Sequence, residues 1–486
     1  MTPHRTGPLV GLRVIELASL APAPFACTVM ADLGADVLRI DRPDIVPARL
    51  KADSVGVPAP APLPTPTSPP VFASDAAENR VAPPHIGSAP PAAPARKIGA
   101  VPPDAPLSET GGVPPDAPLS ETGGVPPGTP LSETGGVPPG TPLSETGGVP
   151  PGVPPPDPLG RGRQSVAIDL RHPRGVETLL RLIEHADVLV EGFRPGVCER
   201  LGIGPEECAA RNPRLIYARL TGYGQDGPLS ARAGHDINYL SLAGALEPLG
   251  PSDGPPLPPL NYVADFGGGG MLLVVGVLAA VFEREQSGRG QVVDASMVEG
   301  SALITALLHG LRASGLWETQ RGTNLFDGSA PFYATYECAD GRFVAVGALE
   351  PQFWAQLLSG LGLADSTDLP AQHERARWPE LRARIAEVFR TRTRDEWADS
   401  FADTDACVSP VLSPFEAHSH AHNVARGTFT EVAGLVQPAP APRFSRTPGA
   451  VASPAPHPGE HAAALAQWGI PEEEIRALQA EGVVAT

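Results

Sequence analysis

A twelve-residue unit repeats four times in tandem between residues 101 and 148. VPPDAPLSETGG occurs twice, and VPPGTPLSETGG follows it twice. The surrounding stretch, residues 44–158, has one aromatic residue, Phe72, and no sustained helical or strand periodicity. A unit with so few large apolar side chains cannot offset its ordering entropy by burial, and repeats that stack into solenoids are longer. We therefore predict that residues 44–158 form a disordered, Pro-rich insertion. A docking segment for an SH3-like partner is the alternative, but the repeats themselves contain no basic residue.

The segments on either side of this insertion carry one continuous pattern. An apolar run at 12–17, a helical stretch and a second strand at 36–40 precede it. After it, strands and helical stretches alternate, in the order 165–170, 174–186, 187–192, 205–212 and 215–223. This alternation predicts an α/β fold with a Rossmann-like, doubly wound parallel sheet. The insertion therefore interrupts one domain and does not link two.

The second half of the chain predicts a smaller α+β domain. Two long helical stretches come first, at 267–285 and 297–315. Two alternating apolar runs within 331–349 then meet at Ala339-Asp340-Gly341, which is a hairpin signal. Helical stretches follow it, at 352–361, 378–391 and 394–403. The pattern predicts a large domain in two parts, residues 1–43 and 159–324, and a small domain at 325–430. A C-terminal segment, 431–486, is expected to return to the large domain.

Charge and cysteine content exclude several classes of partner. The formal net charge of −18 argues against nucleic acid and anionic membranes, because both need a basic face. The five cysteines form no C-x-x-C pair, so we expect reduced thiols and no metal site. The chain opens without an apolar signal region, and its most apolar stretch, 271–282, is about a dozen residues, too short to span a bilayer. We expect a cytoplasmic protein and a buried core helix at 271–282.

Three segments each place one titratable residue among glycines and apolar neighbours. These residues are His235 in GHDINY, Asp265 in ADFGGG and Glu350 in VGALEPQF. No G-x-G-x-x-G follows the first strand, so a dinucleotide cofactor is not predicted. Taken alone, a single histidine is more often structural than catalytic, and an aspartate before glycines is usually a helix cap. A glutamate before a proline is usually exposed.

A resemblance gives these segments a chemical meaning. GHDINYL, NYVADFGGG, DASMVEG, RGTNLFDGSAPFY and AVGALEPQF closely resemble the motif set of the α-methylacyl-CoA racemases, within the CaiB/BaiF (family III CoA-transferase) family. The resemblance implies the CaiB/BaiF fold and a racemase that inverts the α-carbon of 2-methylacyl-CoA thioesters by two-base 1,1-proton transfer through an enolate. His235 and Asp265 would be the two acid/base groups, and Glu350 the carboxylate that hydrogen-bonds the histidine. No cofactor is implied, since CoA is part of the substrate.

The same resemblance implies the CoA and substrate contacts. They are Arg42, Ile168, Asp169, Leu170, Arg171 and Arg200 for CoA, with Gly234, Asp236, Ile237, Asn238 and Tyr239 beside the catalytic histidine. Arginine suits phosphate because its planar fork donates two hydrogen bonds. Three further arginines, Arg161, Arg163 and Arg174, are expected to be solvated surface charges. An intertwined homodimer is also implied, with the small domain of one subunit completing the site of the other.

Two points stay open at this stage. A helix that opens at Gly267–Gly270 could aim its free N–H groups at the enolate oxygen, or could be an ordinary tight helix start. Asp265 could instead be the nucleophile of a true family III CoA transferase, although His235 and Glu350 would then lack a role. Besides the racemase and the transferase, a third interpretation of the function is a non-catalytic CoA-binding or scaffold protein that acts through its repeat segment. The three acid/base candidates argue against this interpretation.

Overall fold

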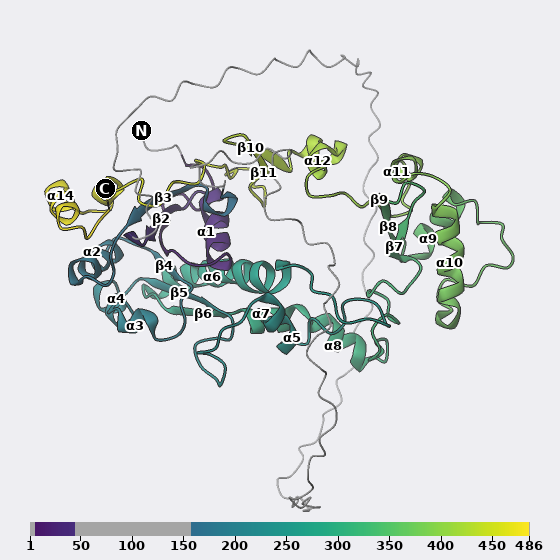
Figure 1. The fold of residues 1–486 in the computed structure, drawn as a ribbon, viewed down its shortest axis with the longest axis horizontal. Coiled ribbons are helices and arrows are strands. Elements are labelled where there is room, and N and C mark those ends of the chain that lie inside the picture. Colours follow the sequence, from purple (N-terminus) through teal and green to yellow (C-terminus); the bar gives the residue numbers. More distant parts are fainter. Residues whose placement is uncertain (1–4, 44–156, 486) are drawn as a thin grey trace, which may run out of the picture. The chain divides into compact units, whose positions relative to one another are not determined.

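The computed structural model describes residues 5–43 and 157–485 of the chain. The predicted insertion, 44–158, lies almost entirely outside the described residues. Six strands form the main sheet: β1 (Arg13–Leu17), β2 (Asp36–Asp41), β3 (Arg163–Ala167), β4 (Val188–Glu191), β5 (Ile216–Thr221) and β6 (Val292–Ser296). All are parallel, in the order β3-β2-β1-β4-β5-β6 (Figure 1). The predicted doubly wound α/β sheet is confirmed.

The two strands that flank the insertion are neighbours in this sheet. β2 and β3 pair in parallel register from Val37 opposite Arg163 to Asp41 opposite Ala167. The chain therefore leaves one strand, passes through the insertion and returns beside the strand that it left. The expectation that the insertion interrupts a single sheet is confirmed by this pairing.

Helices cover both faces of the sheet. One face packs on α1 (Pro22–Asp32), α5 (Asp236–Leu242), α6 (Leu272–Ser287) and α7 (Met297–Ile304). The other packs on α2 (Pro173–Ile183), α3 (Val197–Arg200), α4 (Pro205–Arg211), α13 (Ala464–Gln467) and α14 (Glu472–Ala480). Successive strand residues alternate between the two: Val188 and Val190 belong to the first cluster, and Leu189 to the second.

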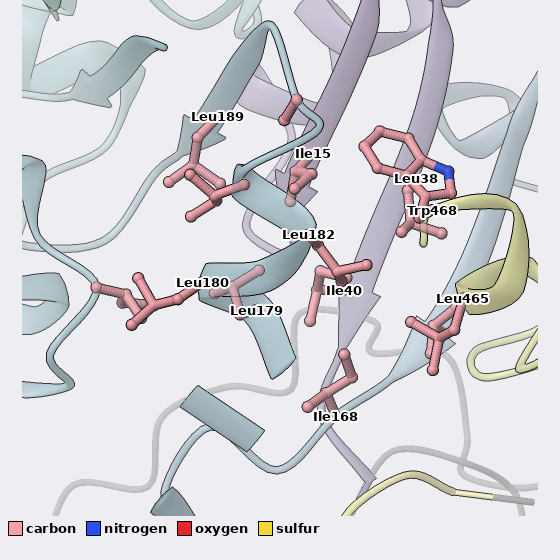
Figure 2. Close-up of a cluster of buried hydrophobic side chains, with 14 of the residues drawn as sticks. Ile15, Leu38, Ile40, Ile168, Leu179, Leu180, Leu182, Leu189, Leu465 and Trp468 are labelled. Carbon is pink, nitrogen blue, oxygen red and sulfur yellow. The ribbon is translucent and has the colours of Figure 1, made fainter. Parts of the chain in front are cut away.

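The C-terminal segment completes the core of the second face. Trp468 and Leu465 lie beside Leu38 and Ile40 of β2 in one buried cluster (Figure 2). Ile168, just beyond β3, also forms an antiparallel bridge with Val484. Burial of a large apolar side chain such as Leu465 or Trp468 contributes about 1.5–3 kcal/mol or more to stability. The C-terminal segment is therefore an integral part of the large domain's core.

The long apolar helix differs from its prediction. It begins at Tyr262 as a π-helix, η4 (Tyr262–Met271), and continues as α6, giving 26 residues whose most apolar 18-residue window has a mean hydropathy of 1.9. By length and composition alone it could cross a bilayer, so the expectation that it is too short is wrong. Leu273, Val274 and Val277 nevertheless pack on the sheet, while Phe282 is 71% exposed. It is a core helix along one face only.

A smaller α+β unit follows, as predicted. Strands β7 (Tyr333–Glu337), β8 (Phe343–Gly347) and β9 (Val408–Pro410) form an antiparallel sheet. α9 (Pro351–Gly360), α10 (Trp378–Phe389) and α11 (Arg394–Phe401) pack around it in a third buried cluster (Figure 1). The remaining elements are α8 (Ala306–Ala313), α12 (Ala421–Arg426), the hairpin β10 (Phe429–Val432) and β11 (Leu435–Pro438), and short 3-10 turns at Pro158–Gly160, Arg375–Arg377 and Ala417–Ser419.

Two arginines predicted to be solvated are buried instead. Arg163 forms an ion pair with Glu16 of β1, Nε to Oε2 2.5 Å, and neither side chain is exposed. Arg161 binds both carboxylate oxygens of Asp32 and donates to Gln437 Oε1 at 2.7 Å. Both follow directly after the insertion, so they tie the returning chain to β1, α1 and the C-terminal hairpin. Arg174 pairs with Glu481 at 40% exposure, nearer to the expectation.

Candidate active site

Two cavities lie at the carboxyl edge of the parallel sheet. The strand order reverses between β1 and β4, and ligands of doubly wound sheets bind at this switch point. One cavity, of about 160 Å³, includes Arg42 in its wall. The other, of about 320 Å³, includes His235. We call them the Arg42 cavity and the His235 cavity. Phe193, in the loop after β4, lines both cavities.

The Arg42 cavity gathers most of the predicted CoA contacts. Its wall contains Arg42 at the end of β2 and the whole run Ile168–Arg171 after β3. Arg171 Nε donates to Asp169 Oδ1 at 2.9 Å, and this hydrogen bond lowers the pKa of the Asp169 carboxyl. Arg200 is not in the wall, although the next residue, Leu201, is. Residues that precede the insertion, Arg42 and Pro43, and residues that follow it, Ile168–Arg171, thus meet at one site.

The His235 cavity contains two arginines that the sequence analysis did not single out. Arg194 and Arg232 line it together with Gly234, His235 and Tyr239. Arg194 stands directly after a buried strand and a glycine, in GFRPG, where parallel strands present ligand-binding side chains. That position was the available signal for it. Arg232, in a long loop, carried no such signal.

A buried ion pair holds the loop that separates the cavities. Glu191, the last residue of β4, accepts the Phe193 N–H at 2.7 Å. Its other oxygen accepts from Arg219 Nε at 2.8 Å, and Arg219 also pairs with Glu199. Because Glu191 and Arg219 are both buried, this network fixes where Phe193 and Arg194 leave the sheet.

His235 precedes helix α5 and faces solvent at the cavity. It is the N-cap residue, and its backbone N–H donates to Asn238 Oδ1 at 3.0 Å. Tyr239 is buried, donates its hydroxyl to Gly234 O, and packs edge-on against Tyr223. Burial raises the pKa of Tyr239 to about 12, so it acts as a neutral donor that fixes the Gly234 turn. Ile237 is exposed and lies outside the cavity wall.

Asp265 lies in the first turn of the π-helix η4, half-buried. Asn261 Nδ2 donates to its Oδ2 at 3.2 Å. Burial raises the pKa of the Asp265 carboxyl, the Asn261 hydrogen bond opposes this rise, the Asp236 charge adds to it, and His235 opposes it. The structure therefore brings His235 and Asp265 within electrostatic reach of each other. Helices with π geometry are rare and occur frequently at functional sites.

The glycine run after Asp265 does not open a helix, so the proposed oxyanion role for it is wrong. Gly267–Gly270 lie inside η4, which begins at Tyr262. A side chain at Gly268 or Gly270 would lie 2.7 Å from Ser301 N or Phe25 Cδ1. The glycines instead permit η4 to pack closely on α7 and α1.

Glu350 is not joined to the other two groups within one chain. It is exposed, precedes α9 in the small domain, and its charge acts on Cys407. Over residues 5–43 and 157–485, His235 and Glu350 share no hydrogen bond or ion pair. The same described ranges contain no group of three or more His, Cys, Asp or Glu side chains arranged to hold a metal ion. All five cysteines are free thiols, as expected.

Comparison with known proteins assigns the family. The model for CoA-transferase family III matches residues 9–63 and 156–462, on both sides of the repeat segment. The chain belongs to CoA-transferase family III. The resemblance inferred from the motifs is thereby confirmed, and with it the CaiB/BaiF fold.

Two curated relatives and one solved structure illustrate the likeness. Alpha-methylacyl-CoA racemase of Mus musculus is 50% identical over 329 residues, covering 67% of this chain and 86% of that protein. Alpha-methylacyl-CoA racemase of Homo sapiens is 48% identical over 332 residues, with the same coverage. The crystal structure of a CaiB/BaiF family protein from Brucella suis superposes with a TM-score of 0.65 at 20% identity, covering 96% of this chain and 100% of that one.

Proposed function

We propose that this protein is a racemase that inverts the α-carbon of 2-methylacyl-CoA thioesters by two-base proton transfer. The observation that carries the proposal is that His235 lines a cavity at the switch point of the sheet and acts electrostatically on the half-buried Asp265. The identity of about half of the aligned residues with two proteins named alpha-methylacyl-CoA racemase supports it.

The geometry suits inversion at a carbon acid. Inversion requires one group to remove the α-proton from one face of the substrate and another to return a proton to the opposite face. Asp265 is half-buried, and burial raises the pKa of its carboxyl, which strengthens it as a proton acceptor relative to an ordinary aspartate. His235 is the second carrier. Arg194 and Arg232 add positive charge at the same cavity, which favours the enolate that forms between the two steps.

CoA would occupy the Arg42 cavity, with its thioester directed past Phe193 into the His235 cavity. Arg42 and Arg171 would bind its phosphates, since arginine donates bidentately to phosphate oxygens. Arg200, on the helix beside this cavity, could reach the same phosphates only from its rim. CoA enters and leaves as part of the substrate, and the proposed chemistry needs no further cofactor.

A CoA transferase is the competing function, because a nucleophilic carboxylate at Asp265 would suit a family III transferase. Solvent exchange separates the two. We expect the wild-type enzyme in D₂O to wash deuterium into the α-position of either enantiomer of a 2-methylacyl-CoA without any acyl acceptor, as measured by mass spectrometry. A transferase would need the acceptor, and hydroxylamine would trap its acyl group from residue 265. Acceptor-dependent turnover with an adduct on Asp265 would overturn the racemase.

We further propose a homodimer in which Glu350 of one subunit supports His235 of the other. The separation of these residues within one chain supports this arrangement. The helices beside the site also leave large apolar side chains exposed, namely Met271, Val275, Phe282, Leu303, Ile304 and Leu307. Exposed apolar side chains gathered on neighbouring helices are typical of a protein interface. Burial of these side chains in a dimer interface would also account for the exposed apolar face of α6. Together with the net charge of −18, this favours a cytoplasmic protein.

Hybrid dimers test whether the site is shared. His235→Ala and Glu350→Ala chains are each expected to be impaired as homodimers. Their co-expression should restore activity, because one of the two sites in a hybrid receives an intact His235 and an intact Glu350. Random pairing would recover about a quarter of the wild-type sites. Absence of recovery, with hybrids confirmed by native mass spectrometry, would place both residues in one subunit's site.

A further inference from the structure

Asp236 differs from the other residues of the GHDINY segment because its side chain is directed inward. It is 5% exposed, whereas His235 and Ile237 on either side of it face solvent. Its Oδ2 accepts the backbone N–H groups of Ala264 at 2.8 Å and Asp265 at 2.9 Å. One carboxylate thus holds the first turn of η4, where the helix leaves its N–H groups without intrahelical partners.

This contact joins the two proton carriers through a short path. Asp236 follows His235 in the chain, and its carboxylate fixes the peptide N–H of Asp265. The separation of the His235 and Asp265 backbones is therefore set by one side chain and two hydrogen bonds. In a two-base reaction both carriers must reach the same carbon from opposite faces, so the rate depends on this separation.

We infer that Asp236 is a positioning residue which holds Asp265 at its working distance from His235 and whose negative charge tunes the proton affinity of Asp265. This inference rests on the proposed racemase mechanism. It also replaces the expectation that Asp236 is a substrate contact, since its side chain is buried and accepts hydrogen bonds from the backbone of η4.

Few charged groups of the surrounding elements are free to act on Asp265. From α5 and its cap come His235, Asp236 and Tyr239. The other packed elements contribute groups that are already engaged or exposed: Cys27 and Asp32 on α1, Arg219 on β5, Asp294 on β6, Glu299 on α7, and Glu283, Arg284 and Glu285 on α6. Asp236 and His235 are therefore the charges expected to dominate at Asp265, and they act in opposite directions.

Two substitutions separate positioning from a merely structural role. In Asp236→Asn the amide oxygen still accepts both N–H groups, so thermal unfolding should stay near that of the wild type. The negative charge is lost, so the pKa of Asp265 should fall. The acidic limb of kcat/KM, measured by deuterium wash-in for the enantiomer that Asp265 deprotonates, should then move to lower pH. In Asp236→Ala both N–H groups lose their acceptor, and kcat should drop about 100-fold.

Asp340→Asn is the matched control, because Asp340 Oδ1 also accepts two backbone N–H groups, from Arg342 and Arg394, in the small domain. It should leave the pH profile unchanged. An unshifted acidic limb in Asp236→Asn would overturn the inference, and so would a wild-type kcat in Asp236→Ala. If Asp236→Ala does not fold, the pH profile of Asp236→Asn alone decides. A wild-type enzyme that exchanges no deuterium would instead overturn the proposed function itself.

Discussion

The His235→Ala variant is expected to lose racemisation by about 10²–10⁴-fold while keeping its fold. His235 is exposed, and the hydrogen bond from its backbone N–H to Asn238 Oδ1 survives the substitution, so the loss would be chemical. Asp265 remains able to exchange the α-proton on its own face. One enantiomer should therefore still wash in deuterium with retention of configuration, and the other should not.

Asp265→Asn is expected to give the mirror result. An amide cannot carry the proton, so exchange should survive only for the enantiomer that His235 deprotonates. Chiral chromatography of the recovered acids, with mass spectrometry for deuterium, resolves the two cases. His185→Ala, an exposed histidine after α2, serves as the control for loss of an imidazole. Wild-type racemisation in His235→Ala, or loss of exchange for both enantiomers in each variant, would contradict the two-base assignment.

The direction of the pKa shift adds a pH signature to this prediction. Burial raises the pKa of Asp265, so the carboxyl stays protonated to a higher pH than an ordinary aspartate. In the direction where Asp265 is the base, kcat/KM should fall as the pH drops through that raised pKa. The acidic limb should therefore lie above the usual aspartate range, and it should be absent from the residual exchange of Asp265→Asn.

The sheet could be predicted from sequence because buried parallel strands are short apolar runs. RVIEL and DVLVE are apolar enough to need both faces covered, and the helices between them show the matching pattern. β6 was missed, since Val292 and Asp294 are exposed at the sheet edge and its sequence lacks a buried run. The early start of η4 was missed for a different reason: YVADFGGGG contains four glycines, and only close packing on α7 and α1 makes them helical.

The sequence motifs identified which residues are candidates for the site, but they did not predict how those residues are arranged. His235, Arg42 and the Ile168–Arg171 run were singled out through motifs, and they line two neighbouring cavities at one edge of the sheet. Asp265 was singled out in the same way and lies within electrostatic reach of His235. The inward turn of Asp236 could not be predicted, because a segment read in order gives no sign of which side chain the next helix covers. In the proposed dimer the role of Glu350 would depend on a second subunit, which local sequence does not describe.

The burial of Arg161 and Arg163 was likewise not predictable from their local sequence, and it has a large expected effect on stability. Arg163→Met should destabilise the protein by about 3–5 kcal/mol, because it leaves Glu16 buried without its counter-charge. Arg163 also donates to Leu159 O and Pro24 O, so those carbonyls lose their donors as well. Against a typical stability of about 5–15 kcal/mol, this loss should lower the urea midpoint strongly.

A double-mutant cycle isolates the ion pair from the packing around it. Glu16→Leu combined with Arg163→Met removes both charges, and it should recover part of the stability that Arg163→Met loses, since apolar replacements of buried pairs are often tolerated. Arg174→Met is the matched control: its pair with Glu481 is partly exposed and should contribute less than about 1 kcal/mol. A urea midpoint of Arg163→Met as close to the wild type as that of Arg174→Met would show that Glu16 and Arg163 are not coupled. If instead the predicted order holds, the buried Glu16–Arg163 pair anchors the chain that returns from the repeat segment to β1, beside the Arg161–Asp32 pair that ties it to α1.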